Sequence, residues 1–167
     1  MPFLTGTINN SQLTINKRRG FTLIELLVAI ALVGILSSFV TSAFISAQKK
    51  GRDSRRKGDL DAIKKTLELA KTDSTGGAYY PGCSPAAASC SPTATTPALA
   101  TTYIKTVPGD PSGGNYTYRP LPASCTSSTC TTFELVACLE NASDPQKEST
   151  LDAACSGKPA SYQVDNP

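Results

Sequence analysis

Histidine is absent from the 167 residues of this chain, and so are the short motifs that mark common enzyme sites. There is no Gly-x-Ser-x-Gly nucleophile elbow and no glycine-rich loop that would hold a phosphate. There is also no Cys-x-x-Cys pair, which together with the missing histidine argues against a zinc site. We therefore expect a protein that is not an enzyme and that has no catalytic residues.

A long apolar run from Phe21 to about Ala47 is almost without charge. Its one charged residue is Glu25, and the basic residues Lys17, Arg18 and Arg19 stand directly before it. About 20 apolar residues suffice to span a bilayer. The positive-inside rule keeps the basic end in the cytoplasm, so the rest of the chain lies outside. A carboxylate within a span costs up to about 3 kcal/mol, which suggests that Glu25 has a use.

Three other interpretations of the apolar run explain less. A secretory signal peptide cleaved near Thr41-Ser42-Ala43 would have an apolar region twice the usual length, with a glutamate inside it. A buried core helix would be shorter and would not need flanking basic clusters. A plain single-pass anchor accounts for the length of the run but not for Glu25.

The residues Gly20-Phe21-Thr22-Leu23-Ile24-Glu25 resemble the class III signal of type IV prepilins and pseudopilins, with every motif position filled. The resemblance implies that a prepilin peptidase cuts after Gly20 and methylates the new amino terminus at Phe21. It also implies that Glu25 aligns subunits during assembly. Other implied partners are a membrane assembly platform, the bilayer before assembly, and identical subunits in a helical filament.

The carboxyl-terminal part is similar to the sheet of major pseudopilin-like proteins. The similarity rests on residues 108–111, Tyr116, Tyr118 and residues 133–140. Major pseudopilins bind calcium through an aspartate-rich loop near the carboxyl end. Here Asp144 and Asp152 lie among serine, threonine and lysine without ligand spacing. We therefore expect no cofactor and no metal, with calcium as the less favoured alternative.

These patterns divide the chain into four parts. Residues 1–20 form a cleaved leader, 21–48 a transmembrane and assembly helix, and 49–72 a basic amphipathic extension of that helix. Residues 73–167 form a disulfide-stapled head, with a loop over 74–102 and a sheet over 102–167. The predicted fold is α+β and pilin-like, with one long helix packed on a small antiparallel sheet of three or four strands.

The helix is expected from Thr22 to Lys71 and to end at Gly76-Gly77. In its second half, an apolar stripe recurs at steps of three and four residues and predicts the face that packs on the sheet: Leu60, Ile63, Leu67 and Ala70. Gly51 and Gly58 weaken the helix and are expected to bend or melt it locally. Strands are predicted over 102–107, 115–119, 131–140 and 160–165. The loop over 74–102 is expected to have little to bury.

Residues 49–72 hold nine bases and four acids, whereas residues 73–167 hold four bases and eight acids. Such a basic stem and acidic head favour stacking between identical subunits. We call residues 49–57, which hold six of the bases, the basic collar. DNA binding by the collar is a weaker alternative, because no aromatic residue is interleaved for base stacking.

All six cysteines follow the apolar run, and an even number in a small exported domain predicts a disulfide framework. Fifteen pairings are open on the sequence alone. We favour the sequential one: Cys83–Cys90, Cys125–Cys130 and Cys138–Cys155. The third bond is expected to contribute most, because it ties the carboxyl-terminal segment across the sheet. The first is expected to contribute much less.

The chain is therefore interpreted as the precursor of a structural subunit of a type IV pilus or pilus-like filament. It would reside in the inner membrane by one span, amino terminus inside, and then enter an extracellular filament. The alternatives are a type II secretion pseudopilin, and a minor or competence pilin that binds DNA or a surface. A single-pass anchored domain with an unprocessed amino terminus is the remaining hypothesis.

Processing supplies the first testable prediction. In Gly20→Val, a side chain crowds the bond to be cut, so the 20-residue leader should stay attached. Intact-mass measurement should find a wild-type species that starts at Phe21 and a variant that retains the leader. A variant processed like the wild type would contradict the assignment of the signal.

Overall fold

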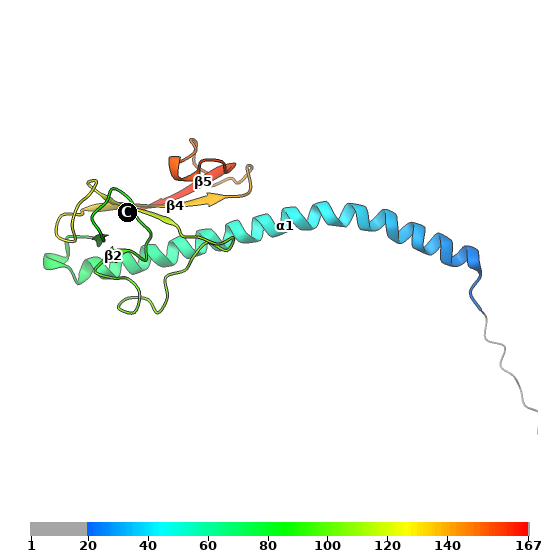
Figure 1. Ribbon diagram of the computed structural model, residues 1–167, viewed down its shortest axis with the longest axis horizontal. Helices are drawn as coiled ribbons and strands as arrows, with labels where there is room; N and C mark the ends of the chain where they lie inside the picture. Colours follow the sequence, from blue (N-terminus) through cyan, green and yellow to red (C-terminus); the bar gives the residue numbers. More distant parts are fainter. Residues whose placement is uncertain (1–19, 167) are drawn as a thin grey trace, which may run out of the picture. The chain divides into compact units, whose positions relative to one another are not determined.

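The computed structural model describes residues 20–166, apart from the side chains of Ser42 and Thr75. Residues 1–19 of the expected leader, including Lys17, Arg18 and Arg19, lie outside the described residues. The chain forms two compact units, the first ending at Thr41 and the second beginning at Ser42. Helix α1 (Leu23–Thr72) runs through both units, which are described separately (Figure 1).

The helix keeps its regular form through the basic collar, where the two glycines led us to expect a bend or local melting. Gly51 and Gly58 both lie inside α1. The cost of each glycine, roughly 1 kcal/mol relative to alanine, is offset here by side chains on either side of them that bind the head. After Thr72 the chain turns through a short 3₁₀ segment, η1 (Thr75–Gly77), in which Gly76 and Gly77 have φ of 73° and 65°. The helix therefore ends just before the glycine pair, as expected.

The apolar stripe of α1 packs on the head as predicted. Leu60 and Leu67 are completely buried, and Ile63 and Ala70 nearly so. These four side chains join one hydrophobic core with Tyr118, Phe133 and Leu135 of the sheet. Because burial of each large apolar side chain contributes roughly 1.5 to 3 kcal/mol, this stripe is a principal source of stability in the second unit.

The main sheet has three antiparallel strands in the order β3-β4-β5 (Figure 1). They are β3 (Thr117–Leu121), β4 (Thr132–Leu139) and β5 (Ala160–Asp165). Tyr118 pairs with Leu135, which in turn pairs with Val164. Phe133, Leu135, Ala137 and Leu139, which alternate along the strand predicted over 131–140, are all buried and form its core face.

The strand predicted over residues 102–107 is wrong. The chain instead reverses around Thr101, which has φ of 68°, and the carbonyl of Leu99 accepts from the amides of Tyr103 and Ile104. Ala100 and Ile104 form only an isolated bridge. Burial of Leu99 and Val107 on either side of this turn explains the difference, since both apolar side chains reach the core only if the segment folds back.

The segment over 74–102 also buries more than expected. It contains a small antiparallel pair, β1 (Gly82–Cys83) and β2 (Thr95–Thr96). Tyr80 is buried with its ring 4.8 Å from that of Phe133, centroid to centroid. Gly82 lies so close to the backbone that a Cβ there would come within 2.9 Å of the carbonyl oxygen of Cys125. The apparent loop is therefore a packed layer of the head.

The six cysteines form three disulfides in the structure: Cys83–Cys90, Cys125–Cys130 and Cys138–Cys155. The first bond does not close an unpacked loop. Cys83 is buried, and the backbone of Cys90 exchanges two hydrogen bonds of 2.8 Å with Tyr118 of β3. These hydrogen bonds attach the segment over 74–102 to the sheet, and the disulfide joins two residues that pack in or against the core. We therefore no longer expect it to contribute much less than the third bond.

Replacement of both cysteines by serine, first in Cys83–Cys90 and then in Cys138–Cys155, should show that the two bonds contribute comparably to the free energy of unfolding. In the chain-entropy model Cys138–Cys155 contributes about 3 kcal/mol and Cys83–Cys90 about 2 to 3 kcal/mol. Chemical denaturation of the two double variants measures both values, and non-reducing peptide mapping of the wild type verifies the pairing. A Cys138 peptide linked to any residue other than Cys155 would refute it.

Candidate functional site: the amino-terminal motif and the basic collar

The start of the apolar run is open to the surroundings in the described part of the chain. Phe21 is 87% exposed. An ideal Cβ at Gly20 would have no heavy atom within 4 Å, so the fold itself does not require glycine at this position. A need for glycine at residue 20 must therefore come from outside the folded chain.

Thr22 caps α1, and Glu25 stands at the third position of the first helical turn. The hydroxyl of Thr22 accepts from the amide of Glu25 at 3.3 Å, and its carbonyl accepts from the amide of Leu26. Thr-x-x-Glu is the spacing of a capping box. The carboxylate thus lies at the amino-terminal, positive end of the helix dipole. Sequence reasoning singled out Glu25 but missed this cap, although the spacing was visible.

The apolar residues between Phe21 and Ile45 are uncovered in the structure. All the large ones are about half exposed or more, from Val28 at 49% to Leu23 at 85%. By length and composition, α1 is the one helix among the described residues that is apolar enough to cross a membrane. An exposed apolar surface of this extent requires lipid or other apolar helices around it.

The basic collar, in contrast, is bound to the head through a buried arginine. Arg56 is only 2% exposed. Its guanidinium donates to Asp53 at 2.7 Å and, in bidentate fashion, to Asp110 at 2.7 and 2.8 Å. It also lies 2.9 Å from Glu140. A buried arginine is tolerated when paired and hydrogen-bonded in this way.

Two neighbours of Arg56 hold the end of β4 against the same turn of helix. Arg52 donates two hydrogen bonds to Glu140, at 2.8 and 2.6 Å. Asp53, itself buried, accepts from the backbone amides of Glu140 and Asn141 at 2.8 to 3.2 Å. The backbone after β4 is thereby fixed to α1.

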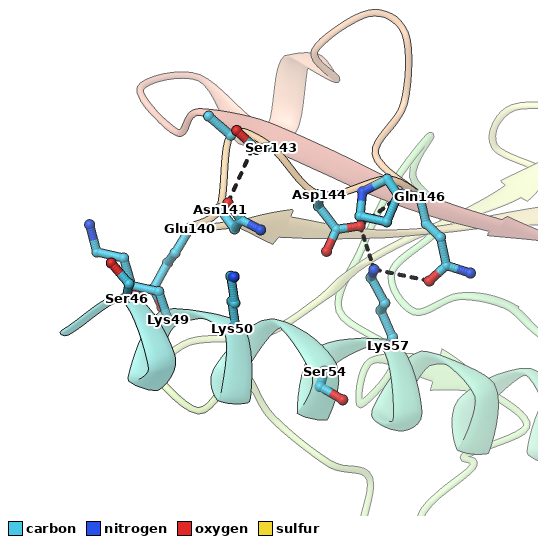
Figure 2. A pocket seen from close by; sticks show the side chains of 12 residues that line it. Ser46, Lys49, Lys50, Ser54, Lys57, Glu140, Asn141, Ser143, Asp144 and Gln146 are labelled. Atoms are coloured by element: carbon cyan, nitrogen blue, oxygen red, sulfur yellow. Dashed lines mark hydrogen bonds and ion pairs between the residues drawn. The ribbon is translucent and has the colours of Figure 1, made fainter. Parts of the chain in front are cut away.

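The two aspartates considered for calcium each have a cationic partner in the structure. Lys57 donates to Asp144 and to Gln146 (Figure 2). Arg119 makes two hydrogen bonds of 2.6 Å to Asp152, whose carboxylate also accepts from the amide of Ala154. Among residues 20–166 no group of three or more His, Cys, Asp or Glu residues is placed to hold a metal ion.

These ion pairs change our expectation for the basic stem and the acidic head, which we expected to pair between neighbouring subunits. Arg52, Arg56 and Lys57 pair with acids of the head of the same chain, whereas we expected the stem to pair with another subunit. The physical reason is proximity, since the head folds directly onto this part of α1. Lys49, Lys50 and Arg55 are the collar bases that remain exposed.

Ion pairs also lower the pKa values of four carboxyl groups of the head. Hydrogen bonds from Arg52, then Arg56 and Ser112, lower the pKa of Glu140 from 4.5 to about 2. For Asp110, burial alone would raise the pKa, but hydrogen bonds from Arg56 and Ser112 outweigh it. The pKa of Asp144 is lowered in the same way by Lys57, against the effect of burial. Arg119 lowers the pKa of Asp152.

Comparison with known protein families identifies the amino-terminal part first. Residues 15–41 match the family described as the prokaryotic N-terminal methylation motif. The match covers Gly20, Phe21 and Glu25, which the sequence analysis had assigned to processing and assembly. No solved structure matches the chain.

Relatives extend the similarity into the head. The type II secretion system core protein G of Escherichia coli K12 is 32% identical over 106 residues, which cover 60% of this chain and 71% of the relative. The protein of the same name from Vibrio cholerae is 30% identical over 106 residues, 61% of this chain and 70% of its own length. The type IV major pilin protein PilA of Myxococcus xanthus is 40% identical, but over only 47 residues, 28% of this chain and 21% of the pilin.

The lowered pKa values predict that acid destabilises the second unit. A group whose pKa is lower in the folded state stabilises the fold above its unfolded pKa, and this contribution is lost as the pH falls through the folded value. For Glu140 the window runs from 4.5 down to about 2, and the shifts of Asp110, Asp144 and Asp152 have the same sign. The denaturation midpoint of the full chain in detergent should therefore decrease as the pH is lowered from 4.5 to about 2.

Glu140→Gln should lower stability near neutral pH, because the ion pairs of Glu140 are lost. It should also make the denaturation midpoint less dependent on pH in acid, because residue 140 can no longer be protonated. Glu148→Gln is the matched control, since Glu148 is exposed and its side chain has no hydrogen bond or ion pair with any residue from 20 to 166. A curve for Glu140→Gln that parallels the wild type at all pH values would show that the pairing does not govern acid sensitivity.

Proposed function

The chain belongs to the family of pilin-like prepilins that includes type II secretion core protein G and the type IV pilins, and we propose that it polymerises into a helical filament through the first half of α1. It is a structural subunit of this family. Members of the family are processed by a prepilin peptidase and assemble with identical subunits. Anchoring in the inner membrane precedes assembly.

The observation that carries the proposal is the uncovered apolar helix with a single carboxylate in its first turn. All large apolar side chains from Phe21 to Ile45 are exposed, and Glu25 is the one charged residue among them. Cleavage after Gly20 would place a positive amine on Phe21, one helical turn from Glu25. In a low-dielectric filament core an unpaired carboxylate is heavily penalised, so pairing with a neighbour's amine would select one register.

The extent of the matches favours a secretion pseudopilus over a pilus. The core protein G relatives from Escherichia coli and Vibrio cholerae align with 60% and 61% of this chain, whereas the Myxococcus xanthus pilin aligns with 28% of it. The amino-terminal motif is common to both classes, so the head carries the distinction. We therefore propose a major pseudopilin-like subunit. The positive-inside rule is the basis for proposing that its amino terminus lies inside and its head outside the membrane.

DNA capture by the basic collar is the weaker function. Arg52, Arg56 and Lys57 are engaged with carboxylates of the head, and a phosphate would have to displace those partners. Only the three remaining collar bases are exposed to bind a polyanion. Affinity for nucleic acid rises with the number of phosphates neutralised, so this surface offers little.

Substitution of Glu25 tests the proposed assembly. In Glu25→Ala the charge is removed from an apolar segment, so membrane insertion should be equal or better. Filaments should be lost or outcompeted by wild-type subunits, because the amine of Phe21 would have no partner. Glu25→Gln, which keeps the volume, should behave like Glu25→Ala. The measurements are membrane fractionation and the yield of sheared filaments.

Ser38→Ala is the matched control, because it removes a polar group from the same segment. Among residues 20–166 the hydroxyl of Ser38 donates to the carbonyl of Ile35, within its own helix. This variant should assemble normally. Wild-type filament yield from Glu25→Ala would disprove the electrostatic selection of register.

A further inference from the structure

A polar pocket lies between the first turns of the basic collar and the loop that follows β4 (Figure 2). It is open and has a volume of about 750 Å³. One wall is formed by Ser46, Lys49 and Lys50 of α1, and the facing wall by Asn141, Ser143 and Gln146. All these residues belong to the second unit, so the pocket lies within one compact body.

The pocket carries uncompensated positive charge. The two carboxylates at its wall are already paired, Glu140 with Arg52 and Asp144 with Lys57. Figure 2 shows Lys50 and Lys57 extending from α1 toward the loop, where Lys57 meets Asp144 and Gln146. The ammonium groups of Lys49 and Lys50 are exposed and make no hydrogen bond or ion pair with any residue from 20 to 166. Two ammonium groups are therefore available for an anionic ligand.

Neutral donors stand beside the two lysines. The side-chain oxygen of Asn141 accepts from the amide of Ser143, which directs the amide nitrogen of Asn141 away from that bond and leaves it as a donor. The hydroxyls of Ser46 and Ser143 also line the pocket. Ammonium, amide and hydroxyl donors around one polar cavity suit an oxyanion with several acceptor oxygens, such as a phosphate.

The position of the lysines along α1 indicates the source of the phosphate. Lys49 and Lys50 follow Ala47, where the apolar run ends, by two and three residues. At 1.5 Å per residue they stand about 3 to 5 Å beyond the apolar segment. If that segment spans the bilayer, as the proposed function requires, the two ammonium groups lie at the level of the lipid phosphates.

We propose that this pocket binds the headgroup phosphate of an anionic phospholipid, with Lys49 and Lys50 as the charged contacts. The lipid is a ligand of the membrane-resident subunit and is released when the subunit enters a filament. It stabilises the subunit in the membrane relative to the extracted state. A carboxylate of a second copy is the competing occupant, but in the membrane lipid phosphates surround this level of α1 in far greater number.

The test uses the full chain in detergent, titrated with phosphatidylglycerol and, in parallel, with phosphatidylcholine of the same acyl chains. Native mass spectrometry counts the bound lipids. The variant is the double substitution Lys49→Gln and Lys50→Gln. At about 1 kcal/mol per lysine, its affinity for phosphatidylglycerol should fall roughly 30-fold, while phosphatidylcholine binding changes little.

Lys64→Gln with Lys65→Gln is the matched control. These adjacent lysines lie on the same helix 15 residues further along, about 22 Å away. The control removes the same charge and should bind phosphatidylglycerol as the wild type does. Circular dichroism melting of both double variants verifies that each is folded.

Three results would overturn the proposal. The first is equal loss of affinity in the two double variants, which would make the effect one of net charge. The second is full displacement of phosphatidylglycerol by millimolar inorganic phosphate, which would make the pocket a site for free phosphate. The third is carbodiimide crosslinking of Lys49 or Lys50 to a second copy in membranes that contain phosphatidylglycerol, which would make the occupant a carboxylate.

Filament yield of the Lys49 and Lys50 double variant, measured in parallel, separates the two proposals. If the wild type forms filaments but does not prefer phosphatidylglycerol to phosphatidylcholine, the lipid-binding proposal is overturned and the proposed function stands. Failure of the wild type to form filaments would overturn the proposed function. The lipid affinity is measured on the subunit in detergent, so it does not depend on whether filaments form.

Discussion

The second unit depends on the burial of Arg56. A guanidinium removed from water is costly unless several acceptors surround it. Here they come from three places in the chain: Asp53 from α1, Asp110 from the turn before β3, and Glu140 from the end of β4. Each of these segments must therefore reach the same turn of the helix. The ion-pair network determines where the head sits along the second half of α1, and the apolar stripe supplies most of the driving force.

The same network decides which charges remain available outside the fold. Arg52 and Lys57 join Arg56 in neutralising the acidic head, so the asymmetry between a basic stem and an acidic head is largely satisfied within one chain. Of the three collar bases that remain exposed, Lys49 and Lys50 line an open pocket next to the end of the apolar run. The part of α1 in the first unit has the opposite requirement, because its apolar surface is complete only with lipid or neighbouring helices around it.

Prediction from sequence succeeded where apolar residues recur at the period of a helix or a strand and that same face is buried. The stripe Leu60, Ile63 and Leu67 is buried, and the face of β4 that carries Phe133 and Leu135 is the core face. It failed over residues 102–107, where β-branched residues suggested a strand. There the burial of Leu99 and Val107, which are separated along the chain, requires a turn. The segment over 74–102 was underestimated for a related reason, because Tyr80 packs on Phe133, which lies far away in sequence.

The sequence by itself determined the membrane-length helix, the Gly20-Phe21 and Glu25 motif and the core face of β4. These features depend on neighbouring residues, whose spacing sets which side of a helix or strand they share. Only the tertiary structure decided which partner each collar base has, and hence that Arg56 is buried while Lys49 and Lys50 are exposed. All three are basic residues on one helix, but of the three it is Arg56 that pairs with Asp110 and Glu140. No local pattern in the sequence places those two acids beside α1, because both lie far from Arg56 along the chain.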